Sequence, residues 1–225
     1  MTDRAESAAA ALADDLPLAD EGREVRIVAS RDAWRGFFRF EVVDLKHRRF
    51  DGQMSPTITR EILHIPEAAA VLPYDPVIDS IVLIEQFRAG CMRHPTGAWL
   101  IEVVAGLVGP GECAVETARR ELVEEAGLEA RRIEKIATYV ASPGAVTERS
   151  TCFIAEVDAS GAGGLHGLEH EAEDIRSFVV PLQTAFDWLE NGRILAANTI
   201  IPLRWLQAHH TELRRRWLAE SEKIA

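Results

Sequence analysis

The chain has 225 residues, of which 47% are hydrophobic, so it can form one sizeable domain with a smaller appendage. Its 25 Lys and Arg residues face 36 Asp and Glu residues, which gives a formal net charge of -11. This acidic balance argues against a surface that grips nucleic acid or anionic lipid by general electrostatics. An anionic ligand would need a cation between itself and the protein.

Residues 1–22 are rich in small and acidic side chains, which bury too little apolar area to offset the entropy of ordering, so we expect a flexible lead-in. The segment lacks the basic and apolar regions of a signal peptide, and no run approaches 18 apolar residues. Cys91, Cys113 and Cys152 show no CxxC spacing, so we expect small buried thiols rather than disulfides or a zinc site. We therefore expect a soluble, cytoplasmic protein without a membrane span.

Short, roughly alternating runs follow, including VRIVAS, RFEVVDLKH and TITREILHI, with a turn signal at Asp51 and Gly52. They predict a small antiparallel β unit over residues 23–65. The remaining residues, 66–225, are expected to form the main domain. Two apolar runs split by "PYDP" open it, and the second, residues 80–87, is typical of a buried strand.

A Glu-rich helix comes next, and the segments after it are expected to be strands, then a loop, then helices. The expected strands are residues 132–141 and 150–158, the Gly-rich loop is residues 158–175, and the helices are residues 182–192 and 198–220. Apolar residues at near-helical spacing mark the buried face of the last helix, namely Ile200, Leu203, Leu206, Leu213 and Trp217.

The Glu-rich helix, within residues 109–128, places Glu121 and Glu125 on one side, one turn apart, with Glu124 beside them. Each like-charge pair at this spacing costs about 0.2–0.5 kcal/mol in an isolated helix. A solvated helix with many salt bridges is the usual reading of such a segment. A hard divalent cation reverses the argument, because Mg²⁺ prefers carboxylate oxygens and is commonly completed by substrate phosphates.

The spacing of the fixed residues separates these readings. From Gly106 the chain follows G, five residues, E, seven residues, then REUxEExGU with U apolar, ending at Leu128. A chance match has an expectation of roughly 10⁻⁸ per starting point if each fixed letter has a frequency of about 7%. The segment resembles the signature of the Nudix hydrolases. This resemblance implies an α/β fold, the Nudix α/β/α sandwich with a mixed sheet, and hydrolysis of a nucleoside diphosphate linked to another group.

The resemblance also implies roles for residues of the box. Glu121, Glu125 and the backbone carbonyl of Ala105 match metal ligands, Glu124 would support or share a metal, and Arg120 would orient the carboxylates by ion pairing. Glu112 would assist. We expect Gly106, Gly109 and Gly111 to let the loop turn tightly into the helix, and Gly127 to end the helix in a left-handed conformation.

Over residues 34–217 the chain is similar to the bacterial ADP-ribose pyrophosphatases. IVLIEQFR matches a strand whose following arginine, Arg88, would face the substrate, and Pro143 lies at a typical offset after the box. Ala145 replaces a glycine often found after that proline. In the acidic loop GLEHEAED, Glu171 matches a general base and Glu173 matches a further metal ligand. By the same reasoning Glu148, which lies outside this loop, is a lesser candidate. An ordinary solvated acidic turn is the alternative.

The N-terminal β unit gains a role from the same resemblance, as part of a homodimer interface that helps to bind the adenosine end of the substrate. Phe37 would stack on adenine, although an aromatic residue in a β pattern is often plain core. Arg60 matches an arginine from the partner subunit, although it and Arg88 could instead form surface ion pairs.

The sequence thus predicts hydrolysis of ADP-ribose to AMP and ribose 5-phosphate, with Mg²⁺, or else Mn²⁺ or another divalent cation, as cofactor. Nucleic acid and membranes are not expected partners. Two alternatives remain. One is a GDP-mannose or other nucleotide-sugar pyrophosphatase, because base choice rests on few contacts. The other is a Nudix module that binds a nucleotide without cutting it, which a broken REXXEE would favour.

Overall fold

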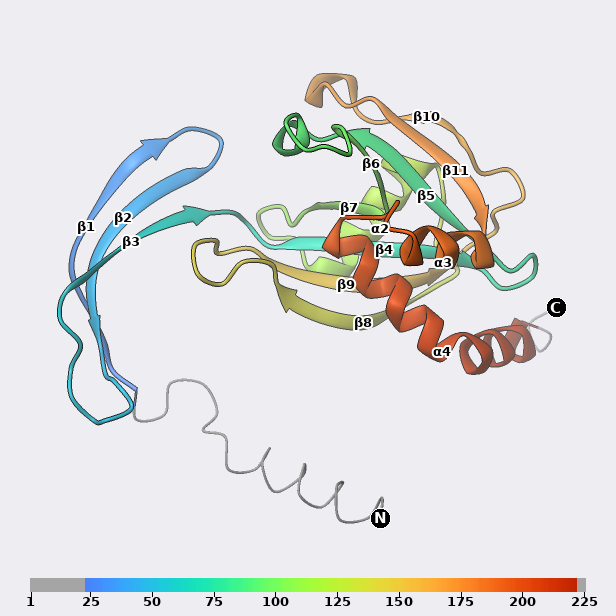
Figure 1. The fold of residues 1–225 in the computed structure, drawn as a ribbon. Helices are drawn as coiled ribbons and strands as arrows, with labels where there is room; N and C mark the ends of the chain where they lie inside the picture. The colour runs from blue at the N-terminus through green and yellow to red at the C-terminus, as the bar shows by residue number, and fades with distance from the viewer. Residues whose placement is uncertain (1–22, 222–225) are drawn as a thin grey trace, which may run out of the picture. The chain divides into compact units, whose positions relative to one another are not determined.

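The computed structural model describes residues 23–221, so the predicted lead-in of residues 1–22 lies outside the described residues (Figure 1). The chain divides into two compact units with the boundary between His64 and Ile65. The boundary expected from the sequence, between residues 65 and 66, lies one residue further along.

The N-terminal unit is a three-stranded antiparallel sheet in the order β1-β2-β3. Its strands are β1 (Val25–Arg35), β2 (Arg39–His47) and β3 (Ile58–His64). Within the described residues of this unit, Val43 is the only buried hydrophobic residue. Every residue of β1 is exposed, including the apolar Ile27 and Trp34, each at 69%. The unit therefore has little core of its own and a large apolar surface.

The second unit is built on an eight-stranded sheet. Its strands are β4 (Ala68–Asp75), β5 (Ser80–Phe87), β6 (Trp99–Glu102), β7 (Val104–Leu107), β8 (Arg132–Val140), β9 (Arg149–Glu156), β10 (Gly164–His166) and β11 (Ile175–Pro181). The main path runs β10-β11-β5-β4-β9-β8, with β6 on β5 and β7 on β4. The β4–β9 pair is parallel and the other pairs are antiparallel, so the sheet is mixed.

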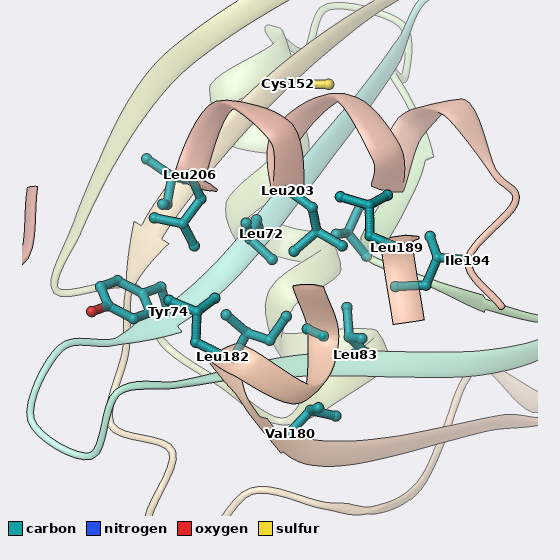
Figure 2. Close-up of a cluster of buried hydrophobic side chains, with 14 of the residues drawn as sticks. Leu72, Tyr74, Leu83, Cys152, Val180, Leu182, Leu189, Ile194, Leu203 and Leu206 are labelled. Carbon is teal, nitrogen blue, oxygen red and sulfur yellow. The ribbon is translucent and has the colours of Figure 1, made fainter. Parts of the chain in front are cut away.

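Helices cover both faces of this sheet (Figure 1). They are α2 (Ala114–Ala126), α3 (Leu182–Glu190) and α4 (Ala197–Ser221), with short 3-10 turns η1 (Ala89–Cys91) and η2 (Glu169–Glu171). Along β4, alternate residues serve the two faces. Val71 packs in the cluster of α2, whereas Leu72 and Tyr74 pack with Leu203 and Leu206 of α4 (Figure 2). The expected α/β/α sandwich is confirmed.

Several predicted details are corrected. The expected break at "PYDP" is wrong, because β4 continues through Asp75 and the turn occupies residues 76–79. The expected loop of residues 158–175 contains β10 and η2, and β11 after it was not predicted. Of the three cysteines, Cys152 alone is buried, and Cys113 is exposed. Within residues 23–221, no helix is long and apolar enough to cross a membrane.

Asp79 links the β4–β5 turn to the C-terminal helix. Its Oδ1 accepts hydrogen bonds from the Tyr74 hydroxyl at 2.8 Å and from His210 Nε2 at 2.7 Å, and its Oδ2 lies 3.2 Å from Arg214 Nη1. Burial alone would raise the pKa of Asp79, but the two hydrogen bonds and the Arg214 charge outweigh it and hold the pKa below its usual value. The ionised carboxylate therefore stabilises the folded state above the pKa of the unfolded chain.

We expect Asp79→Asn to lower the free energy of unfolding by about 1–3 kcal/mol, because it removes charge-assisted hydrogen bonds yet tolerates the positive φ of 52° at this position. Urea denaturation at neutral pH measures the change. The difference should shrink as the pH falls through the native pKa of Asp79, since the wild-type carboxylate is then protonated as well.

Glu212→Gln on α4 is the matched control, because it removes an exposed ion pair with Arg215 and should leave the denaturation midpoint close to that of wild type. Equal denaturation midpoints for wild type and Asp79→Asn would contradict the role given to Asp79.

Candidate active site

The sequence fixes both ends of helix α2. At the start, the Cys113 thiol accepts the Glu116 backbone N–H, and Glu116 Oε2 accepts the Cys113 N–H at 3.0 Å, which forms a capping box. At the end, Gly127 is left-handed with φ 65°, its N–H donates to Val123, and the Leu128 N–H donates to Leu122. The expected left-handed end at Gly127 is confirmed. Both ends hold the helix in place along the sheet.

Helix α2 buries an apolar face and two carboxylates together. Ala118, Leu122 and Ala126 are at most 2% exposed and pack on the sheet. Glu121 and Glu125 lie at the edge of this face and are 9% and 2% exposed. Burial of a carboxyl group disfavours its charged form, so both residues carry a cost that packing alone does not explain.

Glu125 is the most deeply buried acid of the box. Its Oε2 accepts the Ala105 backbone N–H at 3.0 Å, which brings together two of the residues predicted to bind metal. Burial raises the pKa of Glu125 to about 8, the Ala105 hydrogen bond opposes the shift, and the charges of Glu121 and Glu173 add to it. Without a cation, the site favours the protonated form of Glu125 near neutral pH.

Glu121 lies directly over Gly106. A Cβ added at Gly106 would fall 1.7 Å from Glu121 Oε1, so a larger residue there would displace the Glu121 carboxylate. The expected role of Gly106 in a tight turn is wrong, because Gly106 lies within β7, where its missing side chain leaves room for Glu121. Burial raises the pKa of Glu121, Arg120 opposes the shift, and the charges of Glu124 and Glu173 add to it. Glu173 therefore lies close enough to both buried acids to influence them.

Arg120 joins three carboxylates of the box. Its guanidinium contacts Glu112 at 3.0 Å, Glu121 at 2.8 Å and Glu124 at 2.6 Å. Hydrogen bonds from Arg120, Thr117 and the Gly109 backbone hold the pKa of Glu112 at about 2. These ion pairs are the contacts that an orienting role of Arg120 needs, and the roles of Arg120 and Glu112 stay predictions.

Arg88 contacts a buried acid that sequence reasoning missed. Arg88 Nε lies 2.5 Å from Glu102 Oε2, and Glu102 Oε1 lies 3.4 Å from Asn198 Nδ2 at the start of α4. The charge of Arg88 also acts on Glu125, since it lowers the pKa of that carboxyl. Glu102 is 4% exposed, and it could have been suspected as the lone charge within the apolar run WLIEVV.

Glu148, Pro143 and Glu171 lie on loops of the second unit. The half-buried Glu148 accepts the Ser150 hydroxyl at 2.7 Å. Burial raises the pKa of Tyr139, and the charges of Glu148 and Glu102 add to this shift. Pro143 lies in an exposed turn and Glu171 ends η2 on the surface.

Phe37 and Arg60 belong to the N-terminal unit. Phe37 is 88% exposed, with its ring 4.8 Å from that of Phe38, so it is not part of a core. Arg60 is exposed and donates to the Thr59 carbonyl at 2.8 Å, so among the described residues its recorded contact is not an ion pair.

The donor set suits a hard divalent cation, although it is not preassembled. Within residues 23–221, no three acidic, His or Cys side chains form a ready cage. The carboxylates instead use internal donors: Glu121 uses Arg120, Glu125 uses Ala105 and Glu173 uses the Leu168 N–H at 3.4 Å. A cation would replace or share these contacts, and the carboxylates offer oxygen donors, which suit a hard divalent cation.

Comparisons with known proteins agree with this arrangement. An ADP-ribose pyrophosphatase of Shigella flexneri is 44% identical over 204 residues, covering 91% of this chain and 98% of the relative. A GDP-mannose pyrophosphatase of the same organism is 30% identical over 193 residues, covering 84% and 97%. A solved ADP compounds hydrolase shares the fold, with TM-score 0.62, 24% identity and coverage of 88% and 96%. Residues 64–200 match the family model of the NUDIX domain, and the chain therefore belongs to the Nudix family.

Proposed function

We propose that this protein is a pyrophosphohydrolase that adds water across the pyrophosphate bond of ADP-ribose and releases AMP and ribose 5-phosphate. The observation that carries the proposal is the buried pair Glu121 and Glu125 within an intact Nudix box, with Glu121 paired to Arg120 and Glu125 bonded to the Ala105 backbone. The choice of ADP-ribose is supported by the 44% identity to an ADP-ribose pyrophosphatase, against 30% for a GDP-mannose pyrophosphatase.

A pyrophosphate bond opens when phosphoryl charge is neutralised and a water is deprotonated in position. A bound Mg²⁺, or Mn²⁺ or another divalent cation in its place, would neutralise that charge and make a bound water easier to deprotonate. Glu121, Glu125, Glu173 and the Ala105 carbonyl would hold it. Arg120 keeps Glu121 and Glu124 in place through its ion pairs.

Two further groups act on the reactants in this proposal. Glu171 would take the proton from the attacking water, because it lies on the same short loop as Glu173 and is exposed to solvent. Arg88 would bind a phosphate, since Glu102 fixes its Nε while the side chain stays about one third exposed. Glu148 and Pro143 would border the substrate on the loop before β9.

The N-terminal unit would pair with a second copy of the chain. The support is its exposed apolar surface, which includes Ile27, Val28 and Trp34 at 57–69% exposure. Phe37 would stack on adenine and Arg60 would reach the substrate of the partner. A cytoplasmic location remains a prediction from the sequence.

The proposed substrate is tested by incubating the purified protein separately with ADP-ribose, GDP-mannose, NADH and diadenosine polyphosphates in Mg²⁺, with EDTA controls, and separating the products. We expect fast, EDTA-sensitive release of AMP and ribose 5-phosphate from ADP-ribose. Faster turnover of GDP-mannose would keep the Nudix chemistry and change the substrate. Lack of turnover of all four would favour a nucleotide-binding module that does not cut.

Glu125→Gln should lower kcat for ADP-ribose by about 100-fold or more, because it removes a buried charge needed at the reaction centre. Glu129→Gln is the matched control, since Glu129 is an exposed acid just beyond the same helix and should keep wild-type kcat. Steady-state kinetics at saturating Mg²⁺ measure both. Near wild-type turnover of Glu125→Gln would contradict its assignment as a metal ligand.

The pKa of Glu125 also predicts how the stability of the metal-free protein depends on pH. Because the pKa rises from 4.5 to about 8, the folded state keeps a proton that the unfolded chain releases between these values. The free energy of unfolding in EDTA should therefore fall as the pH rises through this window. Glu125→Gln should remove this fall and be more stable than wild type at about pH 8. Parallel pH profiles of the two melting temperatures would contradict the burial argument.

A further inference from the structure

The glycine-rich loop, within residues 158–175, contacts the C-terminal end of helix α2. The Gly167 backbone N–H donates to the Glu124 carbonyl of α2 at 3.3 Å. Beside it, the His166 ring lies 3.1 Å from where a Cβ of Gly127 would be, so these two segments pack closely. The backbone that leads to Glu171 and Glu173 thus starts from a fixed point on the helix that carries Glu121 and Glu125.

Gly167 is also in close contact with Glu173. A Cβ added at Gly167 would lie 2.8 Å from the Glu173 Cβ and 2.9 Å from its backbone oxygen, closer than real Cβ atoms approach. The φ of Gly167 is +99°, a conformation that other residues rarely adopt. The next residue, Leu168, closes the loop, because its N–H lies 3.4 Å from Glu173 Oε2 and its carbonyl accepts the Glu173 N–H at 3.3 Å.

We propose that Gly167 is a positioning residue that fixes Glu173 relative to the buried acids of α2, and so sets the affinity of the site for a divalent cation. The proposal rests on the function proposed above. The Gly167 N–H binds the backbone of α2, and Glu173 occupies the space that a side chain at position 167 would fill. A change here would move Glu173 without touching Glu121 or Glu125.

The alternative is that Gly167 only permits the local turn. A purely local role would alter stability and leave the affinity for a cation unchanged in the folded protein. A positioning role acts through Glu173, so its effect on affinity must vanish when the Glu173 carboxylate is absent. This difference separates the two roles.

The test measures Mn²⁺ binding to the full-length protein by titration, with free Mn²⁺ followed by electron paramagnetic resonance and without nucleotide. We expect Gly167→Ala to weaken Mn²⁺ binding about 10- to 100-fold, the usual effect of a residue that orients a metal ligand. Gly161→Ala is the matched control in the same loop, since a Cβ there meets open space and its φ is not positive. It should bind Mn²⁺ as wild type does.

The double-mutant cycle decides the mechanism. Glu173→Gln alone should weaken Mn²⁺ binding about 10-fold or more, and adding Gly167→Ala should then change it by less than about twofold. Additive losses would overturn the proposal. Wild-type Mn²⁺ binding by Gly167→Ala would also overturn it. Unchanged Mn²⁺ binding by Glu173→Gln would overturn it too, and this second test can be made even if Gly167→Ala fails to fold.

Thermal unfolding in EDTA identifies the folded variants. An assay of ADP-ribose hydrolysis by the same wild-type preparation separates the proposed hydrolase function from the positioning role of Gly167. Hydrolysis without coupling between Gly167 and Glu173 would overturn the positioning role alone. Absence of hydrolysis with intact coupling would overturn the proposed function and leave the positioning of Glu173 standing.

Discussion

The burial of the Glu125 carboxyl is the constraint on which the site depends. A group only 2% exposed, with a single backbone N–H at 3.0 Å and two other acids nearby, is poorly suited to carry charge. The surrounding structure makes this arrangement possible. Gly106 leaves room for Glu121, and Arg120 pairs with Glu121 and Glu124, whereas Glu125 lies outside the ion pairs of Arg120. The cost to stability and the proposed binding of a metal thus have the same origin.

The two faces of the sheet have different roles: one carries the acids of the site, and the other carries a large apolar core. On one face, the apolar side of α2 packs on β4 and places the acids at its edge. On the other face, α3 and α4 complete a large apolar core (Figure 2). Asp79 links α4 to the β4–β5 turn through its contact with His210. The start of α4 also reaches the site, because Asn198 contacts the Glu102 that holds Arg88. Packing far from the acids therefore supports Arg88, the group proposed to bind a phosphate.

Local patterns could be read from the sequence, whereas contacts between distant segments could not. The acidic face and the glycine end of α2 follow from spacing, and the buried β5 follows from its continuous apolar run. Strand β11 was missed because its short run follows a glycine-rich loop and its pairing with β5 is far apart in sequence. Glu102 and Gly106 were missed or misread for the same reason, since their partners Asn198 and Glu121 are brought near only by the fold.

The most direct test of this account measures the protons released when Mg²⁺ binds. Titration calorimetry at about pH 7, in buffers of different ionisation enthalpy and without nucleotide, gives the number of protons released per ion. Because the pKa of Glu125 is raised to about 8, the account predicts release of about one proton by wild type and almost none by Glu125→Gln. A heat of binding that does not depend on the buffer in wild type would contradict the central claim that Mg²⁺ ionises a buried, protonated Glu125.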